Sequence, residues 1–486
     1  MCMKFVDNSF FASSLATCSF IMNLIHFQNN CISILTILCW WSLQTLAYSK
    51  SDRDWLKNLH STSQDSRKSA ITIHQPRAAI NPRHAPKHHG GKVINSDKIF
   101  RAIWNLRNHC GDRFGIELPL SDYGIEFNRN DKCTGGNVIN LFHRNQMGLF
   151  PRYEYVPGPG NETQPVPVNG GIPQLANITQ HLEKAAEDIT STIPDPKFDG
   201  VAVIDWEAWR PQWKENFDLL RIYQEKSIAH VKELHPEWDT AMVESVARLE
   251  WEQGAKLFME STLELAKTLR PNTNWGFYMY PLCLIHGDTA NMSCTAATVT
   301  NNNNVMWLFN ERTALYPSIY LRPFHFYQKL WVRSKLQEAL RVRQRSDDPQ
   351  GVIMSYTRFN YSDTGLFYSL EDLNNTILQS AEFGTNGVIL WGETLDVSTV
   401  EECSQLRSYI INALGPTVVM SRKGAESCSM RICSGNGRCV GDILACRSAD
   451  RPRDPMKVGV DQGHGENTCS CRCFRGWEGD TCSVRM

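Results

Sequence analysis

Two acidic side chains one residue apart, Asp205 and Glu207, follow an apolar run in the segment FDGVAVIDWEAWRPQW (198–213). On an extended strand, residues i and i+2 point to the same side, so both carboxylates are expected to face one cavity. Two carboxyl groups held together cannot both ionise freely, and one keeps its proton near neutral pH. A protonated carboxyl can act as the general acid in cleavage of a glycosidic bond.

The same two acids also fit a solvated strand end or an ion pair with Arg210. Three neighbouring tryptophans, Trp206, Trp209 and Trp213, favour the catalytic interpretation, because sugar rings pack on aromatic faces. The residues alone therefore suggest a carbohydrate-active enzyme.

Short apolar runs suited to buried parallel strands alternate with longer segments of helical periodicity. The expected strands are 99–105, 200–206, 274–280, 305–310, 352–358 and 387–392, and the expected helices are 174–193, 213–236, 240–271 and 324–344. No Gly-rich phosphate loop opens a helix, so the α/β pattern predicts a distorted (β/α) barrel, TIM-like, rather than a doubly wound sheet. Barrels carry their chemistry at the C-terminal ends of the strands.

Length and cysteine usage predict a secreted protein of more than one part. The chain has 486 residues and 17 cysteines, eight of them between Cys428 and Cys482. An apolar run, Ile32–Leu46, precedes small residues and predicts a signal peptide, with a signal anchor as the alternative; translation from Met22 would give a more ordinary signal peptide. The predicted parts are a signal peptide (1–48), a disordered or processed leader (49–96), the catalytic barrel (97–421) and a small disulfide-rich domain (422–486).

Charge and composition limit the partners. With 50 Lys+Arg against 51 Asp+Glu, nothing favours binding to nucleic acid or stable insertion into a membrane. The histidines of the leader lack cysteine or carboxylate partners at ligand spacing, so neither a metal nor a cofactor is expected. Sequons for N-glycosylation occur at Asn161, Asn177, Asn291, Asn360 and Asn374.

Several segments, in order along the chain, resemble the hyaluronidases, the vertebrate and venom family of endo-acting glycoside hydrolases. They are the signature 198–213, FPRY with GGIPQ (150–174), NWGFYMYP (274–281), ALYPSIYL (314–321), YTR (356–358) and GVILWG (387–392). The resemblance implies a monomeric, secreted enzyme that cuts hyaluronan after N-acetylglucosamine by substrate-assisted retaining catalysis. An enzyme shifted toward chondroitin, and a catalytically weak or dead hyaluronan-binding protein, are the alternatives.

Carried onto this chain, the family mechanism makes Glu207 the acid/base and Asp205 its partner, which binds the acetamido group and shares the proton. Tyr278 and Tyr320 would position that group. The implied substrate contacts are Trp391, Arg210, Tyr356, His143 and Ser318.

The resemblance also implies disulfides. The barrel pairs would be Cys110–Cys403 and Cys283–Cys294. The last 60 residues resemble an EGF-like module, whose pattern would pair Cys428–Cys439, Cys433–Cys471 and Cys473–Cys482, with Cys446–Cys469 as an extra bridge. Cys133 is left over.

Two departures from the family pattern lie near the expected site. Where the family usually has FYGFPDC, this chain reads FYMYPLC, so Leu282 replaces an aspartate and the titration of the acidic pair is expected to differ. His143 stands where tyrosine is usual, and an imidazole there could stack on a sugar or attract glucuronate.

Overall fold

The computed structural model describes most of the chain from residue 99 onward. The described residues are 99–107, 109–130, 132–158, 162–285, 292–310, 312–323, 326–392, 398–446 and 469–486. The predicted signal peptide and leader, and the sequons at Asn161 and Asn291, lie outside them. Within the described part, none of the helices combines the length and hydrophobicity needed to cross a bilayer.

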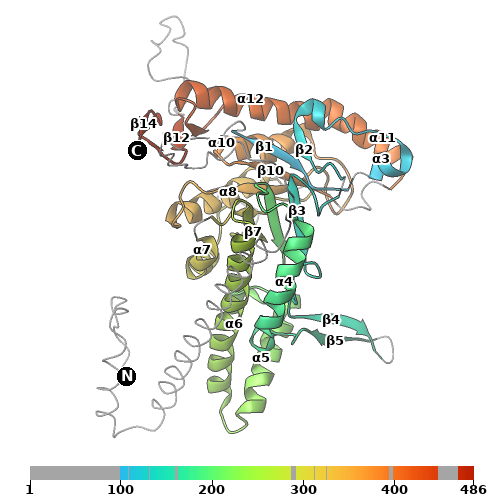
Figure 1. The fold of residues 1–486 in the computed structure, drawn as a ribbon, viewed down its shortest axis with the longest axis vertical. Helices are drawn as coiled ribbons and strands as arrows, with labels where there is room; N and C mark the ends of the chain where they lie inside the picture. The colour runs from blue at the N-terminus through green and yellow to red at the C-terminus, as the bar shows by residue number, and fades with distance from the viewer. Residues whose placement is uncertain are drawn as a thin grey trace, which may run out of the picture. The chain divides into compact units, whose positions relative to one another are not determined.

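Eight parallel strands form the frame of the fold (Figure 1). They are β1 (Arg101–Trp104), β2 (Ile125–Phe127), β3 (Ile139–His143), β6 (Val201–Asp205), β7 (Asn274–Met279), β8 (Tyr316–Pro317), β9 (Met354–Arg358) and β10 (Gly387–Trp391). Two four-stranded sheets, in the orders β2-β1-β10-β9 and β3-β6-β7-β8, are joined by parallel bridges from Leu315 to Ile353 and from Ser318 to Tyr356. The strand order is that of the predicted (β/α) barrel, which the structure confirms.

A buried asparagine joins β2 and β3, the two outer strands of the joined sheets. Asn128, the residue after β2, donates through Nδ2 to the carbonyl oxygen of Ile139 in β3 at 2.7 Å. Its Oδ1 accepts from the backbone N–H groups of Val138 and Ile139, both at 3.0 Å. Gly136 packs so closely that a Cβ there would lie 1.9 Å from Asn128 Cγ. A side-chain amide thus takes the place of a strand ladder between β2 and β3.

Alternating strand residues divide the core into two layers, as expected for strands buried on both faces. Ile103 of β1 and Ile389 of β10 belong to the cluster inside the barrel. Their neighbours Trp104 and Leu390 belong to the outer cluster, which packs against the surrounding helices.

The helices follow the strands as expected for this fold class. They are α3 (His109–Phe114), α4 (Ile178–Thr192), α5 (Arg221–Leu234), α6 (Thr240–Leu269), α7 (Ala296–Asn304), α8 (Gln328–Arg345), α9 (Leu370–Leu373), α10 (Gln379–Glu382), α11 (Val400–Tyr409) and α12 (Gly415–Ile432). Asp239 caps α6 by accepting from the N–H of Met242, and Thr399 with Glu402 forms a capping box on α11.

Shorter elements complete the chain. They are the 3-10 turns η1 (Ser121–Tyr123), η3 (Pro173–Leu175), η4 (Trp213–Glu215), η5 (Asp218–Leu220) and η6 (Met306–Phe309), the π-helical turns η7 (Asn374–Leu378) and η9 (Ile410–Leu414), and the antiparallel pairs β4 (Arg152–Pro157) with β5 (Thr163–Val168), β11 (Gly437–Val440) with β12 (Ser470–Cys473), and β13 (Trp477–Glu478) with β14 (Val484–Arg485).

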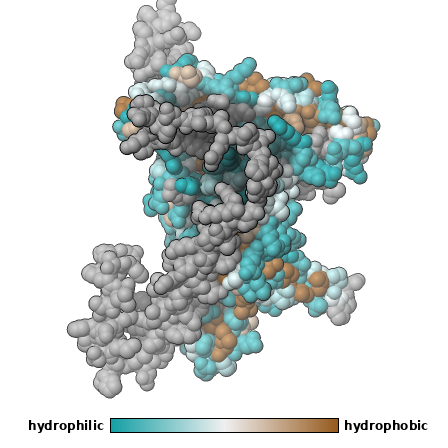
Figure 2. All heavy atoms as spheres, viewed as in Figure 1, coloured by the Kyte–Doolittle hydropathy of each residue, from teal (hydrophilic) through white to brown (hydrophobic). Residues whose placement is uncertain are grey.

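The long helices α5 and α6 lie side by side and extend away from the strands, next to the β4–β5 hairpin (Figure 1). On the face shown in Figure 2 the described surface is largely hydrophilic, with hydrophobic side chains scattered over it. Leu234, the last residue of α5, is 58% exposed.

One predicted strand is wrong, and three of the eight barrel strands were not predicted. Residues 305–310 contain η6 instead of a strand, because a short apolar run fits a buried helical turn as well as a strand. β2 and β8 have three and two residues, too few for an apolar run to stand out. β3 has five residues, as β6 and β9 do, and its sequence INLFH was not recognised as a strand.

The C-terminal disulfide-rich part is continuous with the barrel. The boundary predicted between residues 421 and 422 falls inside α12, and Cys428 of that helix lies in the outer core cluster. Arg472 donates to the carbonyl oxygen of Gly351 at 3.1 Å, and Arg475 pairs with Asp348 at 2.9 Å. Both partners immediately precede β9, so this region packs at the end of the barrel where the strands begin.

Disulfides join the expected cysteines. The pairs in the structure are Cys110–Cys403, Cys283–Cys294, Cys428–Cys439, Cys433–Cys471, Cys446–Cys469 and Cys473–Cys482. Cys133 is unpaired and half-buried, and burial raises the pKa of its thiol.

The described sequons differ in exposure. Asn177 is exposed and caps α4 through its side-chain oxygen, which leaves its amide nitrogen available to a glycan. Asn374 is half-buried. Asn360 is 1% exposed, which disfavours a glycan at that position.

Candidate active site

The acidic pair lies at the C-terminal end of β6. Asp205 is the last residue of the strand and stands in register with His143, the last residue of β3. Side chains in register on neighbouring parallel strands point to the same side, and Nδ1 of His143 lies 2.9 Å from Oδ2 of Asp205. One carboxylate oxygen of the pair is therefore already occupied.

The other oxygen of Asp205 is buried, and apart from Glu207, whose carboxyl interacts with this side chain, no N–H or O–H group of the described residues donates to it. Glu207 reaches the solvent, but the surrounding protein desolvates it and, together with the negative charge of Asp205, raises its pKa to about 7; Arg210 and His143 oppose this shift. A neutral Glu207 can donate its proton to the carboxylate of Asp205, so the two side chains can share one proton near neutral pH.

Arg210 braces the loop that carries Glu207. Its guanidinium donates to the carbonyl oxygen of Glu207 at 2.7 Å and to Sδ of Met279 at 3.3 Å. Its own carbonyl oxygen accepts from Asn216 and Trp251 at 2.8 and 3.1 Å. These internal hydrogen bonds hold the guanidinium beside Glu207, and the contact with the polymer stays a prediction.

Tyrosines from neighbouring strands lie beside the acids. The hydroxyl of Tyr278 in β7 donates to Oγ of Ser318 at 3.2 Å, and its ring lies 6.3 Å from that of Tyr320. Desolvation raises the pKa of Tyr278 to about 12 and raises the pKa of Tyr320 as well, so both hydroxyls keep their protons. The structure thus brings Tyr278, Ser318 and Tyr320 together as hydrogen-bonding groups.

Tyr356 was predicted to contact substrate, but it lies in the barrel core. It is 2% exposed, and its ring packs edge-on against Tyr278 with 5.1 Å between centroids. Its hydroxyl accepts from Nδ2 of Asn105 at 3.2 Å. The residue packs against Tyr278 inside the barrel. The strand pattern indicates the face on which a side chain lies but not its depth, so the burial of Tyr356 could not be predicted.

The three tryptophans near the acids are not sugar platforms in this structure. Trp206 and Trp209 are 5% and 2% exposed and stack on Phe150. Trp213 is partly buried and packs edge-on against Trp251. These rings instead form the packing beneath the Glu207 loop. Trp391 at the end of β10 is half-exposed and meets the ring of His143 edge-on at 6.2 Å.

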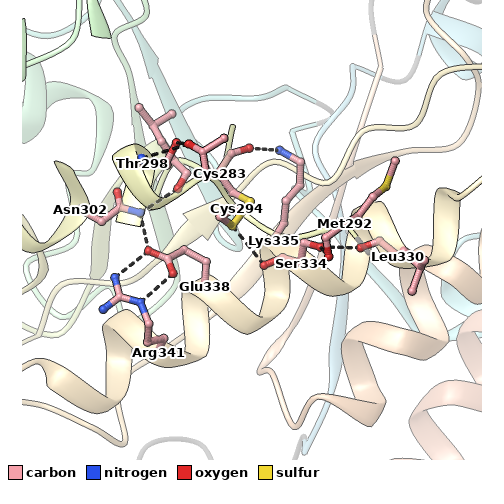
Figure 3. Close-up of a disulfide and its surroundings, with 12 residues drawn as sticks. Cys283, Met292, Cys294, Thr298, Asn302, Leu330, Ser334, Lys335, Glu338 and Arg341 are labelled. Carbon is pink, nitrogen blue, oxygen red and sulfur yellow. Dashed lines mark hydrogen bonds and ion pairs between the residues drawn. A yellow bond between two sulfur atoms is a disulfide. The ribbon is translucent and has the colours of Figure 1, made fainter. Parts of the chain in front are cut away.

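The Cys283–Cys294 disulfide closes a short loop after β7 (Figure 3). Lys335 of α8 donates to the carbonyl oxygen of Cys283 at 3.3 Å, and burial lowers its pKa to about 8. Leu282 is 7% exposed, and its carbonyl oxygen accepts from Asn302, so its side chain is part of the packing beside this loop.

Two residues of the site had no place in the sequence interpretation. Met279 has a positive φ of 78°, a left-handed conformation that favours glycine, and it stands at the glycine of the family pattern FYGFPDC. Asn105, just after β1, orients Tyr356. The glycine at this position of the family pattern was the one sequence signal that could have predicted the left-handed conformation of Met279.

The one cluster of metal-ligating atoms in the described part consists of Cys428, Cys446 and Cys469, whose sulfurs are in disulfides.

Comparison with known proteins decides the family. The hyaluronidase family profile matches residues 90–448. The chain belongs to the hyaluronidase family.

Similarity to individual hyaluronidases extends over most of the chain. It is 34% identical to hyaluronidase-1 of Mus musculus over 420 residues, 81% of this chain and 88% of the relative. It is 37% identical to hyaluronidase-3 of Sus scrofa over 401 residues, 79% of this chain and 90% of the relative. A crystal structure of bee venom hyaluronidase in complex with a hyaluronic acid tetramer aligns with a TM-score of 0.60 and 35% identity, covering 66% of this chain and 98% of that one.

Proposed function

We propose that this protein is an endo-acting hyaluronidase that hydrolyses the β-1,4 bond between N-acetylglucosamine and glucuronate in hyaluronan. The observation that carries the proposal is Glu207, whose pKa is raised to about 7 beside Asp205 at the end of β6, in a chain of the hyaluronidase family. A carboxyl with such a pKa is still protonated in acidic and near-neutral solution, as a general acid must be.

The proposed mechanism is the substrate-assisted one that the family resemblance implies. Glu207 gives its proton to the leaving glycosidic oxygen while the acetamido oxygen of the substrate attacks the anomeric carbon, forming a cyclic intermediate. The Glu207 carboxylate then takes a proton from water as that water opens the intermediate, which restores the configuration and the acid. The carboxylate of Asp205 accepts from the acetamido N–H of the substrate or from the protonated Glu207.

The neutral phenols complete this arrangement. Tyr278 and Tyr320 carry O–H groups beside the acids and would bind the acetamido oxygen as charge develops on the sugar. His143, Trp391 and Ser318 would line the sugar-binding groove. No metal or cofactor enters these steps.

Secretion, a monomeric state and an EGF-like C-terminal part belong to the same proposal. Six disulfides support an oxidising compartment, since reducing compartments keep thiols free. The antiparallel β11–β12 pair, with Cys439 opposite Cys471, supports an EGF-like hairpin.

Digestion of hyaluronan tests the proposal, with chondroitin and chitin in parallel, over a range of pH. Even-numbered oligosaccharides ending in reducing N-acetylglucosamine are expected, and Glu207→Gln should abolish their release. Glu382→Gln is the matched control, because burial also raises the pKa of this α10 glutamate to about 7. Binding of hyaluronan without cleavage at any pH would favour the binding-protein alternative, and faster cleavage of chondroitin would favour the shifted-specificity alternative.

A further inference from the structure

His143 contacts the acidic pair directly rather than lining only the groove. Asp205, as a carboxylate, can only accept a hydrogen bond, so the Nδ1–H of His143 donates to it across 2.9 Å. The Asp205 side chain is 18% exposed and that of His143 is 43% exposed. The Asp205 end of the contact is therefore mostly buried, whereas the imidazole of His143 is open to solvent.

The backbone and a neighbouring ring fix the position of this imidazole. The N–H of His143 donates to Oε1 of Gln146 at 3.0 Å, and its carbonyl oxygen accepts from the N–H of Gln146 at 2.8 Å. Trp391 of β10 lies edge-on to the ring. Held this way, the imidazole keeps its Nδ1 toward Asp205 at the shared register of β3 and β6.

The charges around this contact are few. From β6 and the loop after it, Asp205 and Glu207 face His143, and β10 offers the uncharged Trp391. On the far side of Asp205 stand the neutral phenols of Tyr278 in β7 and Tyr356 in β9. Arg210 acts on Glu207 from its own loop, and Arg144, next to His143 in sequence, acts on Glu154 of β4 and on Tyr223 of α5.

We propose that His143 is a positioning residue that makes the catalytic pair respond to pH, by holding Oδ2 of Asp205 so that Oδ1 remains for Glu207 or the substrate. The inference rests on the proposed function. It concerns a group that stands where tyrosine is usual in the family pattern, and a phenol carries no positive charge in acid.

The sign of the effect follows from the charge. Histidine gains a positive charge as the solution becomes acidic. A positive charge beside the acidic pair favours the ionised forms of the pair and lowers the pKa of Glu207. Activity is thereby retained to lower pH, and its alkaline decline also begins at lower pH. Removing the charge should move both limbs of the activity profile upward.

His143→Asn is the decisive variant, because the amide keeps an N–H group near the place of Nδ1 but cannot become charged. We expect both limbs of the kcat profile on hyaluronan to move up by about half a pH unit, the size expected for a partly exposed charge pair. Activity at the acidic end should fall about threefold while the maximum kcat is largely kept. His143→Ala should lower the maximum as well.

His235→Asn is the matched control. His235 also forms an ion pair, with Glu237 at 3.8 Å, and its side chain is 41% exposed, but it lies at the turn between α5 and α6. Its profile should superimpose on that of the parent enzyme.

Two results would overturn the inference while leaving the proposed function intact. One is a His143→Asn profile that coincides with the parent profile; the other is a raised KM with no shift of either limb, which would mean that His143 contacts only the sugar. Absence of cleavage by the unmodified protein at every pH would instead defeat the proposed function.

Discussion

Arg210 donates a hydrogen bond of 2.7 Å to the carbonyl oxygen of Glu207, so its side chain holds the backbone of the proton donor in place after β6. The same guanidinium reaches Met279 at the end of β7. Two strand ends are therefore joined through one side chain, and the position of the proton donor depends on it.

Replacement of Arg210 should lower kcat more than it raises KM. Arg210→Lys cannot reproduce the fork to Glu207 and Met279, and about a tenfold loss of kcat is expected from misplacement of the acid. Arg210→Met also removes the positive charge, which lowers the pKa of Glu207, so the alkaline limb should move upward in this variant only. Steady-state kinetics on hyaluronan across pH would check both expected effects. A change in KM alone would support the predicted role of Arg210 as a contact to the polymer.

Glu215 predicts a pH-dependent stability. It is 5% exposed, accepts from Asn301 at 3.0 Å, and burial raises its pKa from 4.5 to about 7. The folded state binds this proton more tightly than the unfolded state, so the contribution is present below pH 4.5 and is lost as the pH rises through about 7.

Glu215→Gln should therefore leave stability unchanged in acid and raise it by about 3 kcal/mol at pH 8. Urea denaturation at both pH values would measure the difference. Glu225→Gln, on the exposed face of α5, serves as the control and should show no comparable gain. Equal effects of Glu215→Gln at both pH values would contradict the assignment.

The side-chain closure between β2 and β3 should be important for stability. Asn128→Leu removes the donor to Ile139 and the acceptor for Val138 and Ile139, and it leaves buried backbone groups without partners, at a cost of about 3 kcal/mol. Hydrogen exchange at the Ile139 amide should accelerate with it. Asn130→Ala, whose hydrogen bonds are exposed, should cost far less; similar losses in the two variants would remove the special role of Asn128.

The sequence predicted the parts of the fold and site that depend on pattern and motif. The apolar run before Asp205 predicted the strand that ends at this residue, and the short spacing to Glu207 predicted that the two carboxyl groups interact. The long helix α6 followed from its periodicity. The order of the cysteines, read through the family resemblance, anticipated pairs as distant as Cys110 and Cys403.

The sequence could not predict how deeply each site residue is buried or which side chains it contacts. Trp209 and Tyr356 have the residue types of sugar contacts, but packing places them in the core. The contact between His143 and Asp205 joins residues 62 positions apart, and it depends on a strand register that no local pattern specifies.

The Cys110–Cys403 disulfide gives the barrel a consequence beyond stability. It links the helix after the first strand to the helix after the last across 293 positions, so nearly the whole ring of strands lies within one covalent loop. A protease that cut a single surface loop between these two cysteines would produce two fragments still tied to each other. Such a nicked enzyme would migrate as one species under non-reducing conditions and separate into two fragments only on reduction. The disulfide would hold the two fragments together within one barrel.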